Sequence, residues 1–185
     1  MPDHCRFFRG LSVNDVVVQR RKAFQNMIEA VHHIGLTVVS LDTALAFWQG
    51  FTGRPPRWVK VLDRPYLGKV VGYPGVSIKA AFVDLSGGGV IELLEYQLTG
   101  RVANPDATAN PGNVHLCLKV TDIASVWQQA VASGARPLSP DGPVYIDGGP
   151  NLGAMAAYLR IHDGITLELF QTPPAPKELP DTLDA

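Results

Sequence analysis

Two histidines and two glutamates recur at matching places in the two halves of this 185-residue chain: His33 with His115, and Glu92 with Glu168. Imidazole nitrogens mixed with carboxylate oxygens suit Zn, Ni, Co, Mn or Fe in a site that keeps room for water or a substrate oxygen. A buried carboxylate without a partner is costly, and a bound metal removes that cost. The four residues therefore predict one divalent metal ion, whose identity the donor set leaves open.

The matches come from an internal repeat. HHIGLTVVSLDTALAFW (32–48) aligns with VHLCLKVTDIASVW (114–127) at a shift of 82 positions, and AAFVDLSGGGVIELL (80–94) aligns with AAYLRIHDGITLELF (156–170) at a shift of 76. His32 competes with His33 as a ligand. The repeat favours His33, because a slip of one residue would lose the aliphatic matches and turn every side chain of the strand to the other face.

The first half reads as strand, helix and three strands. β-branched alternation predicts strands at 31–39, 57–63, 76–85 and 90–96, the last two joined by the turn SGGG. Ser40 or Asp42 opens the helix, and Gly50 or Gly53 closes it. The Gly- and Pro-rich segment 64–75 is interpreted as a loop.

The second half repeats this order. The pattern predicts strands at 113–120, 143–148, 154–161 and 165–171, and a helix between Asp122 as cap and Gly134 as stop. A sheet with one helix has one covered face and one open face, so two such modules can curve their open faces into a cup. The predicted class is α+β, with two paired βαβββ modules forming a curved, cup-like mixed β-sheet around the metal.

Five segments follow from these patterns. They are an N-terminal arm or helix (1–29), the first module (30–98), a Pro-, Asn- and Gly-rich linker (99–112), the second module (113–172) and a flexible tail (173–185). Strand edges at the ends of the modules need covering, which favours a homodimer. Whether a cup forms within one chain or across a dimer is left open.

Strand alternation also names candidate substrate contacts. Thr37 shares a face with His33, Cys117 and Lys119 share one with His115, and Phe170 shares one with Glu168. Lys119 would hold an anionic group or simply be solvated, and Cys117 is more plausibly a small apolar residue than a reactive thiol. Tyr73, with Trp58, Arg64 and Tyr66, lies in or beside the 64–75 connection and would form a substrate wall or ordinary packing.

Composition excludes several function classes. The net charge of −1 offers no field for nucleic acid or anionic membrane, and no apolar run approaches ~18 residues. The N-terminus lacks the apolar core of a signal peptide, and two cysteines are too few for a disulfide scaffold, so a cytoplasmic protein is expected. Phosphate-loop, dinucleotide and C-x-x-C motifs are absent from the sequence, which leaves a small-molecule substrate as the expected partner.

The segments HHIGLTV, GGGVIELLEY, NVHLCLKV and DGITLELFQ resemble, in this order, the motifs of the vicinal oxygen chelate superfamily. That superfamily holds glyoxalase I, methylmalonyl-CoA epimerase, extradiol dioxygenases, fosfomycin-modifying enzymes and bleomycin-binding proteins. The resemblance covers about residues 30–172 and implies paired βαβββ modules with a divalent metal at His33, Glu92, His115 and Glu168.

The full ligand set resembles glyoxalase I and the epimerase. Extradiol dioxygenases use two His and one Glu, and bleomycin-binding members lack the ligands. Thr37 stands where glyoxalase I carries a glutathione-contacting Arg, so the epimerase is the nearer likeness. However, residues 64–83 contain no acid where epimerases carry an extra catalytic Glu. The expected activity is isomerase or lyase chemistry with Glu92 or Glu168 moving the proton. A ring-cleaving dioxygenase or a non-catalytic binding protein is the alternative.

Overall fold

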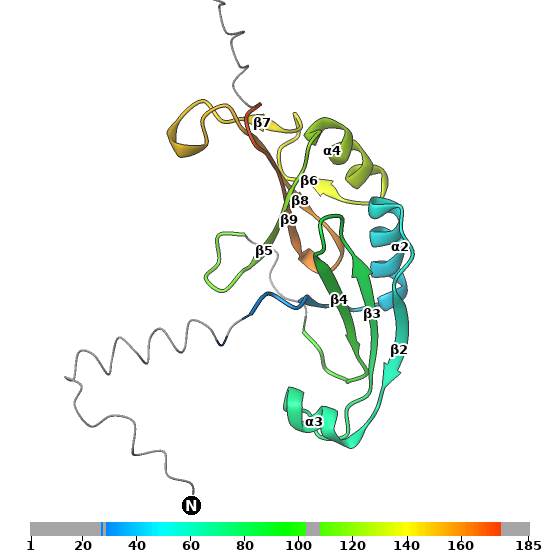
Figure 1. The fold of residues 1–185 in the computed structure, drawn as a ribbon. Coiled ribbons are helices and arrows are strands. Elements are labelled where there is room, and N and C mark those ends of the chain that lie inside the picture. Colours follow the sequence, from blue (N-terminus) through cyan, green and yellow to red (C-terminus); the bar gives the residue numbers. More distant parts are fainter. Residues whose placement is uncertain (1–26, 28, 103–107, 175–185) are drawn as a thin grey trace, which may run out of the picture. The chain divides into compact units, whose positions relative to one another are not determined.

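The computed structural model describes residues 27, 29–102 and 108–174. The chain divides into two units after His32, and every element below belongs to the second unit (Figure 1). The α+β class with two βαβββ modules is confirmed. Most of the predicted N-terminal helix and of the tail lies outside the described residues. Within the described part, no helix is long and apolar enough to cross a membrane.

The first module forms a four-stranded sheet in the order β1-β4-β3-β2. Strand β1 runs parallel to β4, and the other neighbours are antiparallel. Its elements are β1 (Ile34–Thr37), α2 (Leu41–Thr52), β2 (Trp58–Leu62), α3 (Pro65–Val71), β3 (Ile78–Asp84) and β4 (Val90–Tyr96). Helix α2 ends at Gly53, whose φ of 67° is left-handed. The β3–β4 turn closes with the Leu85 N–H donating to the Gly89 carbonyl.

Helix α3 corrects the loop that was predicted for 64–75. Pro65 occupies the first helical position, where its missing N–H costs nothing, and Gly72 ends the helix with a φ of 79°. Leu67 is buried, and a Cβ at Gly68 would lie 2.7 Å from the Tyr73 carbonyl oxygen. Pro and Gly therefore mark the two ends of a short helix here, and the sequence interpretation took them for breakers.

The second module forms a sheet in the order β5-β9-β8-β6, with β7 also paired to β8. Its strands and helix are β5 (His115–Lys119), α4 (Ile123–Ala132), β6 (Arg136–Pro137), β7 (Val144–Tyr145), β8 (Met155–Arg160) and β9 (Thr166–Gln171). Two short 3₁₀ helices, η1 (Gly149–Asn151) and η2 (His162–Gly164), join them. The strand predicted at 143–148 shrinks to β7. The unpredicted β6 borders β8, and two residues are too few to show alternation.

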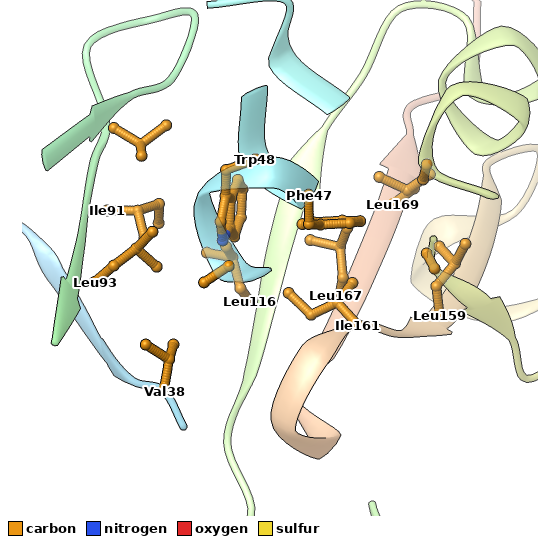
Figure 2. Close-up of a cluster of buried hydrophobic side chains, with 14 of the residues drawn as sticks. Val38, Phe47, Trp48, Ile91, Leu93, Leu116, Leu159, Ile161, Leu167 and Leu169 are labelled. Carbon is orange, nitrogen blue, oxygen red and sulfur yellow. The ribbon is translucent and has the colours of Figure 1, made fainter. Parts of the chain in front are cut away.

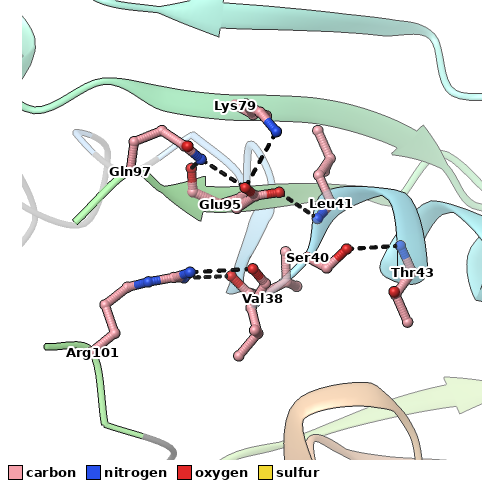
Figure 3. A network of polar contacts seen from close by, with 9 residues as sticks. Val38, Ser40, Leu41, Thr43, Lys79, Glu95, Gln97 and Arg101 are labelled. Atoms are coloured by element: carbon pink, nitrogen blue, oxygen red, sulfur yellow. Dashed lines mark hydrogen bonds and ion pairs between the residues drawn. The ribbon is translucent and has the colours of Figure 1, made fainter. Parts of the chain in front are cut away.

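The two helices begin in the same way. The side chain of Ser40 accepts from the Thr43 N–H at the start of α2, and that of Asp122 accepts from the Ser125 N–H at the start of α4. A residue near the end of the last strand of each module also accepts from the first turn of its helix, and Figure 3 shows this contact in the first module. Glu95 accepts from the Leu41 N–H at 2.7 Å, and Gln171 accepts from the Ile123 N–H at 2.7 Å. These contacts were not predicted, although the repeat aligns Glu95 with Gln171.

One hydrophobic core joins the two modules. Helices α2 and α4 pack on each other and on one face of each sheet. The buried side chains come from both modules (Figure 2): Val38, Phe47, Trp48, Ile91, Leu93, Leu116, Leu159, Ile161, Leu167 and Leu169. Trp48 also donates from Nε1 to His162 Nε2 at 3.1 Å. The helix-covered faces are thus buried together, and the opposite faces carry the predicted ligands.

Candidate functional site

Each sheet carries one histidine–glutamate pair. In the first module His33 precedes β1, Gly35 pairs with Glu92 across β1 and β4, and His33 Nε2 lies 2.9 Å from Glu92 Oε2. In the second module Cys117 pairs with Glu168, and His115 Nε2 lies 2.9 Å from Glu168 Oε2. The structure thus arranges the four predicted residues as two equivalent pairs. His32, the competing ligand, is the last residue of the other unit.

The geometry of each pair fits two adjacent ligands of one metal ion. Two donors about 2.1 Å from a metal, at an octahedral angle, lie about 3.0 Å apart. The observed separation is 2.9 Å in both pairs. The side chains of Glu92 and Glu168 are 17% and 16% exposed, so each carboxylate is largely covered but still open on one side. Within the described residues, however, no cluster of three or more His, Cys, Asp or Glu could hold a metal.

Aromatic rings flank the first pair. Phe82 lies opposite Glu92 in the β3–β4 register, and its ring is 5.6 Å from that of His33. Trp58 packs on Phe82 at 4.5 Å. This ring contact fits either role considered for Trp58, a substrate wall or ordinary packing. Of the other predicted wall residues, Arg64 immediately precedes α3 and Tyr66 is exposed on it.

A tyrosine takes the place of Phe82 beside the second pair. Tyr158 lies opposite Glu168 in the β8–β9 register, and its hydroxyl is 3.5 Å from His115 Nε2. Burial, followed by the charge and hydrogen bonding of Glu168, raises the pKa of Tyr158. The phenol is therefore protonated at neutral pH and available as a donor. The sequence analysis missed Tyr158, although the repeat alignment of Phe82 with Tyr158 contains the difference.

Cys117 is the register partner of Glu168, and its surroundings disfavour the thiolate. Burial, with further contributions from the charge and hydrogen bonding of Glu168, raises the pKa of its thiol to about 11. A protonated thiol is a poor nucleophile and a poor metal ligand. The first module has Gly35 in this position, so Glu92 has no counterpart to this thiol.

The predicted substrate contacts fall beside two open cavities. Thr37 and Tyr73 line a pocket of about 470 Å³ on the first sheet, called the Tyr96 pocket below. Its lining also includes Tyr96, Leu98, Thr99 and Arg101. Cys117 and Lys119 line a larger cavity of about 1300 Å³ beside β5. Phe170 lies opposite Lys119 in the β5–β9 register and is half-buried.

Comparison with solved structures shows the same fold. A glyoxalase family protein from Bacillus cereus is 19% identical with a TM-score of 0.67, covering 80% of this chain and 96% of its own. A glyoxylase/bleomycin resistance protein/dioxygenase domain from Frankia sp. is 20% identical with a TM-score of 0.57, covering 80% and 96%. A variant of the fosfomycin resistance protein FosX from Listeria monocytogenes, in complex with Mn(II) and a dihydroxypropylphosphonic acid, is 18% identical with a TM-score of 0.52, covering 79% and 94%.

The curated proteins give no significant match to this sequence. The family model described as Glyoxalase/Bleomycin resistance protein/Dioxygenase superfamily matches residues 32–150. That span contains the first module, the linker and the second module as far as η1, which is more than half of the chain. It confirms the resemblance drawn from the sequence motifs, and the chain belongs to the glyoxalase/bleomycin resistance protein/dioxygenase superfamily.

Proposed function

We propose that this protein is a metal-dependent isomerase or lyase that moves a proton next to a substrate carbonyl. The observation that carries the proposal is the pair of equivalent His–Glu contacts, each 2.9 Å long, on the open faces of two repeated sheets. His33, Glu92, His115 and Glu168 would hold one divalent ion. The ion would polarise a substrate oxygen and acidify the neighbouring C–H bond.

A complete site requires both pairs, and we infer that they meet across two copies of the chain. One chain buries the helix-covered faces of its sheets in a shared core, and its described residues contain no three-residue metal cluster. Among the described residues, strands β1 and β5, which adjoin or carry the histidines, each pair with a single neighbouring strand. A second copy of the chain would cover these edges. The first pair of each copy would then face the second pair of the other, giving a homodimer with two sites.

The surroundings of the two glutamates suggest different roles. Glu168 has two register partners with side-chain donors, Cys117 with its thiol and Tyr158 with its hydroxyl. At the equivalent positions Glu92 meets Gly35 and Phe82, which offer no side-chain donor. A carboxylate with fewer fixed hydrogen bonds is freer to leave a metal and accept a proton. We therefore assign the proton transfer to Glu92, and the firmer ligand role to Glu168.

The nearest activities remain those expected from the sequence. An epimerase of acyl thioesters comes first and a glyoxalase I-like lyase second, because this chain has Thr37 at the position where glyoxalase I carries a glutathione-contacting Arg. The Mn(II) held by FosX supports including manganese among the candidate metals. A dioxygenase would instead consume oxygen, and a plain binding protein would hold no metal.

Metal analysis of the purified protein, followed by deuterium exchange from solvent, tests this function. The proposal expects about one divalent ion per chain, and uptake of deuterium into a 2-oxo acid, a hemithioacetal or an acyl-CoA thioester. A metal-free protein after reconstitution with Zn, Ni, Co, Mn and Fe would refute the metal site. Oxygen consumption with ring cleavage of a catechol would refute the proton-transfer chemistry.

A further inference from the structure

The Tyr96 pocket opens on the face of the first sheet that carries Glu92, and its lining contains neither His33 nor Glu92. Thr37 is on the same face of β1 as Gly35, the register partner of Glu92. Tyr96 lies four residues after Glu92 along β4, so both side chains lie on the same face of the strand. After burial, the charge of Tyr73 and that of Glu92 raise the pKa of Tyr96. A ligand whose reacting end is at Glu92 would therefore extend into this pocket.

The pocket is lined by hydroxyls and one guanidinium. Thr37, Tyr73, Tyr96 and Thr99 contribute the hydroxyls, and the rings of the two tyrosines meet edge to face with centroids 6.0 Å apart. Arg101 contributes the positive charge, and none of the residues that line the pocket is an acid. Such a lining favours an anion that also carries an apolar body.

Two backbone carbonyls hold the guanidinium of Arg101, and no acidic side chain of the described residues forms an ion pair with it. Its Nη1 donates to the Val38 carbonyl at 2.9 Å and its Nη2 to the Val39 carbonyl at 3.2 Å (Figure 3). Both of these acceptors are neutral backbone groups, and each Nη carries a second N–H. A fixed guanidinium with free donors is well suited to a carboxylate, which it can bind through two parallel hydrogen bonds. The nearby Glu95 is already occupied by Leu41, Lys79 and Gln97.

We propose that the Tyr96 pocket binds the carboxylate of a substrate with an apolar body, with Arg101 as the anion contact and Tyr96 as a neutral donor. This assignment rests on the proposed function, because it places the reacting carbonyl at the His33–Glu92 pair. Among the substrates on which metal-assisted proton transfer is possible, the pocket would favour those that carry a carboxylate. Arg101 would then set specificity rather than take part in the proton transfer.

Binding of phenylacetate and its neutral analogue phenylacetamide tests the pocket. The full chain is titrated in EDTA and followed by ¹H–¹⁵N NMR, so that the result does not depend on the metal. We expect phenylacetate to shift the amides of Thr37, Gly100 and Arg101 and to bind about tenfold more tightly than the amide. Equal binding of the two probes, or shifts centred on Cys117 and Lys119, would overturn the proposal.

Three variants identify the residue responsible. Arg101→Gln should abolish the preference for the acid, and Arg101→Lys, which keeps the charge and supports the same carbonyls, should retain part of it. Arg54→Gln, at an exposed arginine outside the pocket, should leave the preference unchanged. An unaltered preference in a folded Arg101→Gln protein would overturn the assignment. Loss of metal binding alone would refute the proposed function and leave this result standing.

Discussion

The two modules place a His–Glu pair at the same register and surround it differently. In the first module Glu92 lies between Gly35 and Phe82, and in the second Glu168 lies between Cys117 and Tyr158. The backbone repeat thus reproduces the pair, and the neighbouring side chains distinguish its two copies. Equivalent ligands need not have equivalent roles, because hydrogen bonds from neighbours decide how firmly each carboxylate is held.

The largest expected effect is loss of the metal. His33→Ala or His115→Ala should reduce bound metal to near zero and lower the melting temperature of the reconstituted protein, because a metal bound only by the folded state stabilises it. Elemental analysis and a thermal melt with and without EDTA measure both effects. His32→Ala is the matched control and should retain the metal, and full retention in His115→Ala would remove the second pair from the site.

The two glutamates should separate in activity. Glu92→Gln should keep most of the metal and lower the rate of deuterium exchange by about 100-fold or more. Glu168→Gln should mainly weaken metal binding, because it removes the charged ligand whose register partners Cys117 and Tyr158 carry side-chain donors. Exchange rates measured at saturating metal distinguish the two effects. The assignment of roles fails if Glu92→Gln exchanges normally, or if the two variants lose metal equally.

The strand side chains that accept from the first N–H of α2 and of α4 differ in charge. This difference predicts a smaller effect, on stability. Glu95 accepts from the first N–H of α2 as a carboxylate, and Gln171 accepts from α4 as a neutral amide. Glu95→Ala should cost about 1.5–3 kcal/mol and Gln171→Ala about 0.5–1.5 kcal/mol in free energy of unfolding. Urea unfolding measures both, and an equal cost would show that the charge adds nothing.

The same contrast predicts a dependence on pH. The hydrogen bond from Leu41 is the main cause that lowers the pKa of Glu95 in the folded protein. A carboxyl group with a lowered folded pKa stabilises the protein above its unfolded pKa, and this stability is lost as the pH falls through the folded value. Below about pH 4.5, the free energy of unfolding should therefore fall less steeply with pH in Glu95→Gln than in the wild type. In Gln171→Ala the slope of this free energy against pH should be the same as in the wild type.

The smallest predicted effect concerns the contact between the modules. Burial is the main cause that lowers the pKa of His162, and its Nε2 accepts the Trp48 N–H only while unprotonated. Stability from this residue is fully present above its unfolded pKa of about 6.5 and declines as the pH falls toward the folded value. Urea unfolding between pH 5 and 7.5 should show this decline, and His162→Gln should reduce it. If the free energy of unfolding depends on pH in the same way in His162→Gln as in the wild type, His162 is not the cause of the decline.

The repeat made much of the fold and of the pairs predictable from sequence. Both alignment shifts reappear in the strand registers, since Gly35 faces Glu92 as Cys117 faces Glu168. Two elements were missed: α3 was hidden by its terminal Pro and Gly, and β6, the counterpart of β2, has only two residues. The separation of the pairs could not be predicted, because it depends on how α2 and α4 pack and not on the pattern of any strand.

The central claim is that each site combines the first pair of one chain with the second pair of another. Mixing unfolded His33→Ala and His115→Ala proteins in equal amounts and refolding them tests it most directly. Random pairing makes about half of the dimers mixed, and each mixed dimer would contain one intact and one doubly altered site. The account predicts recovery of about one quarter of the wild-type metal and exchange activity. If the mixture binds no more metal than the separate variants, each site lies within one chain and the account is wrong.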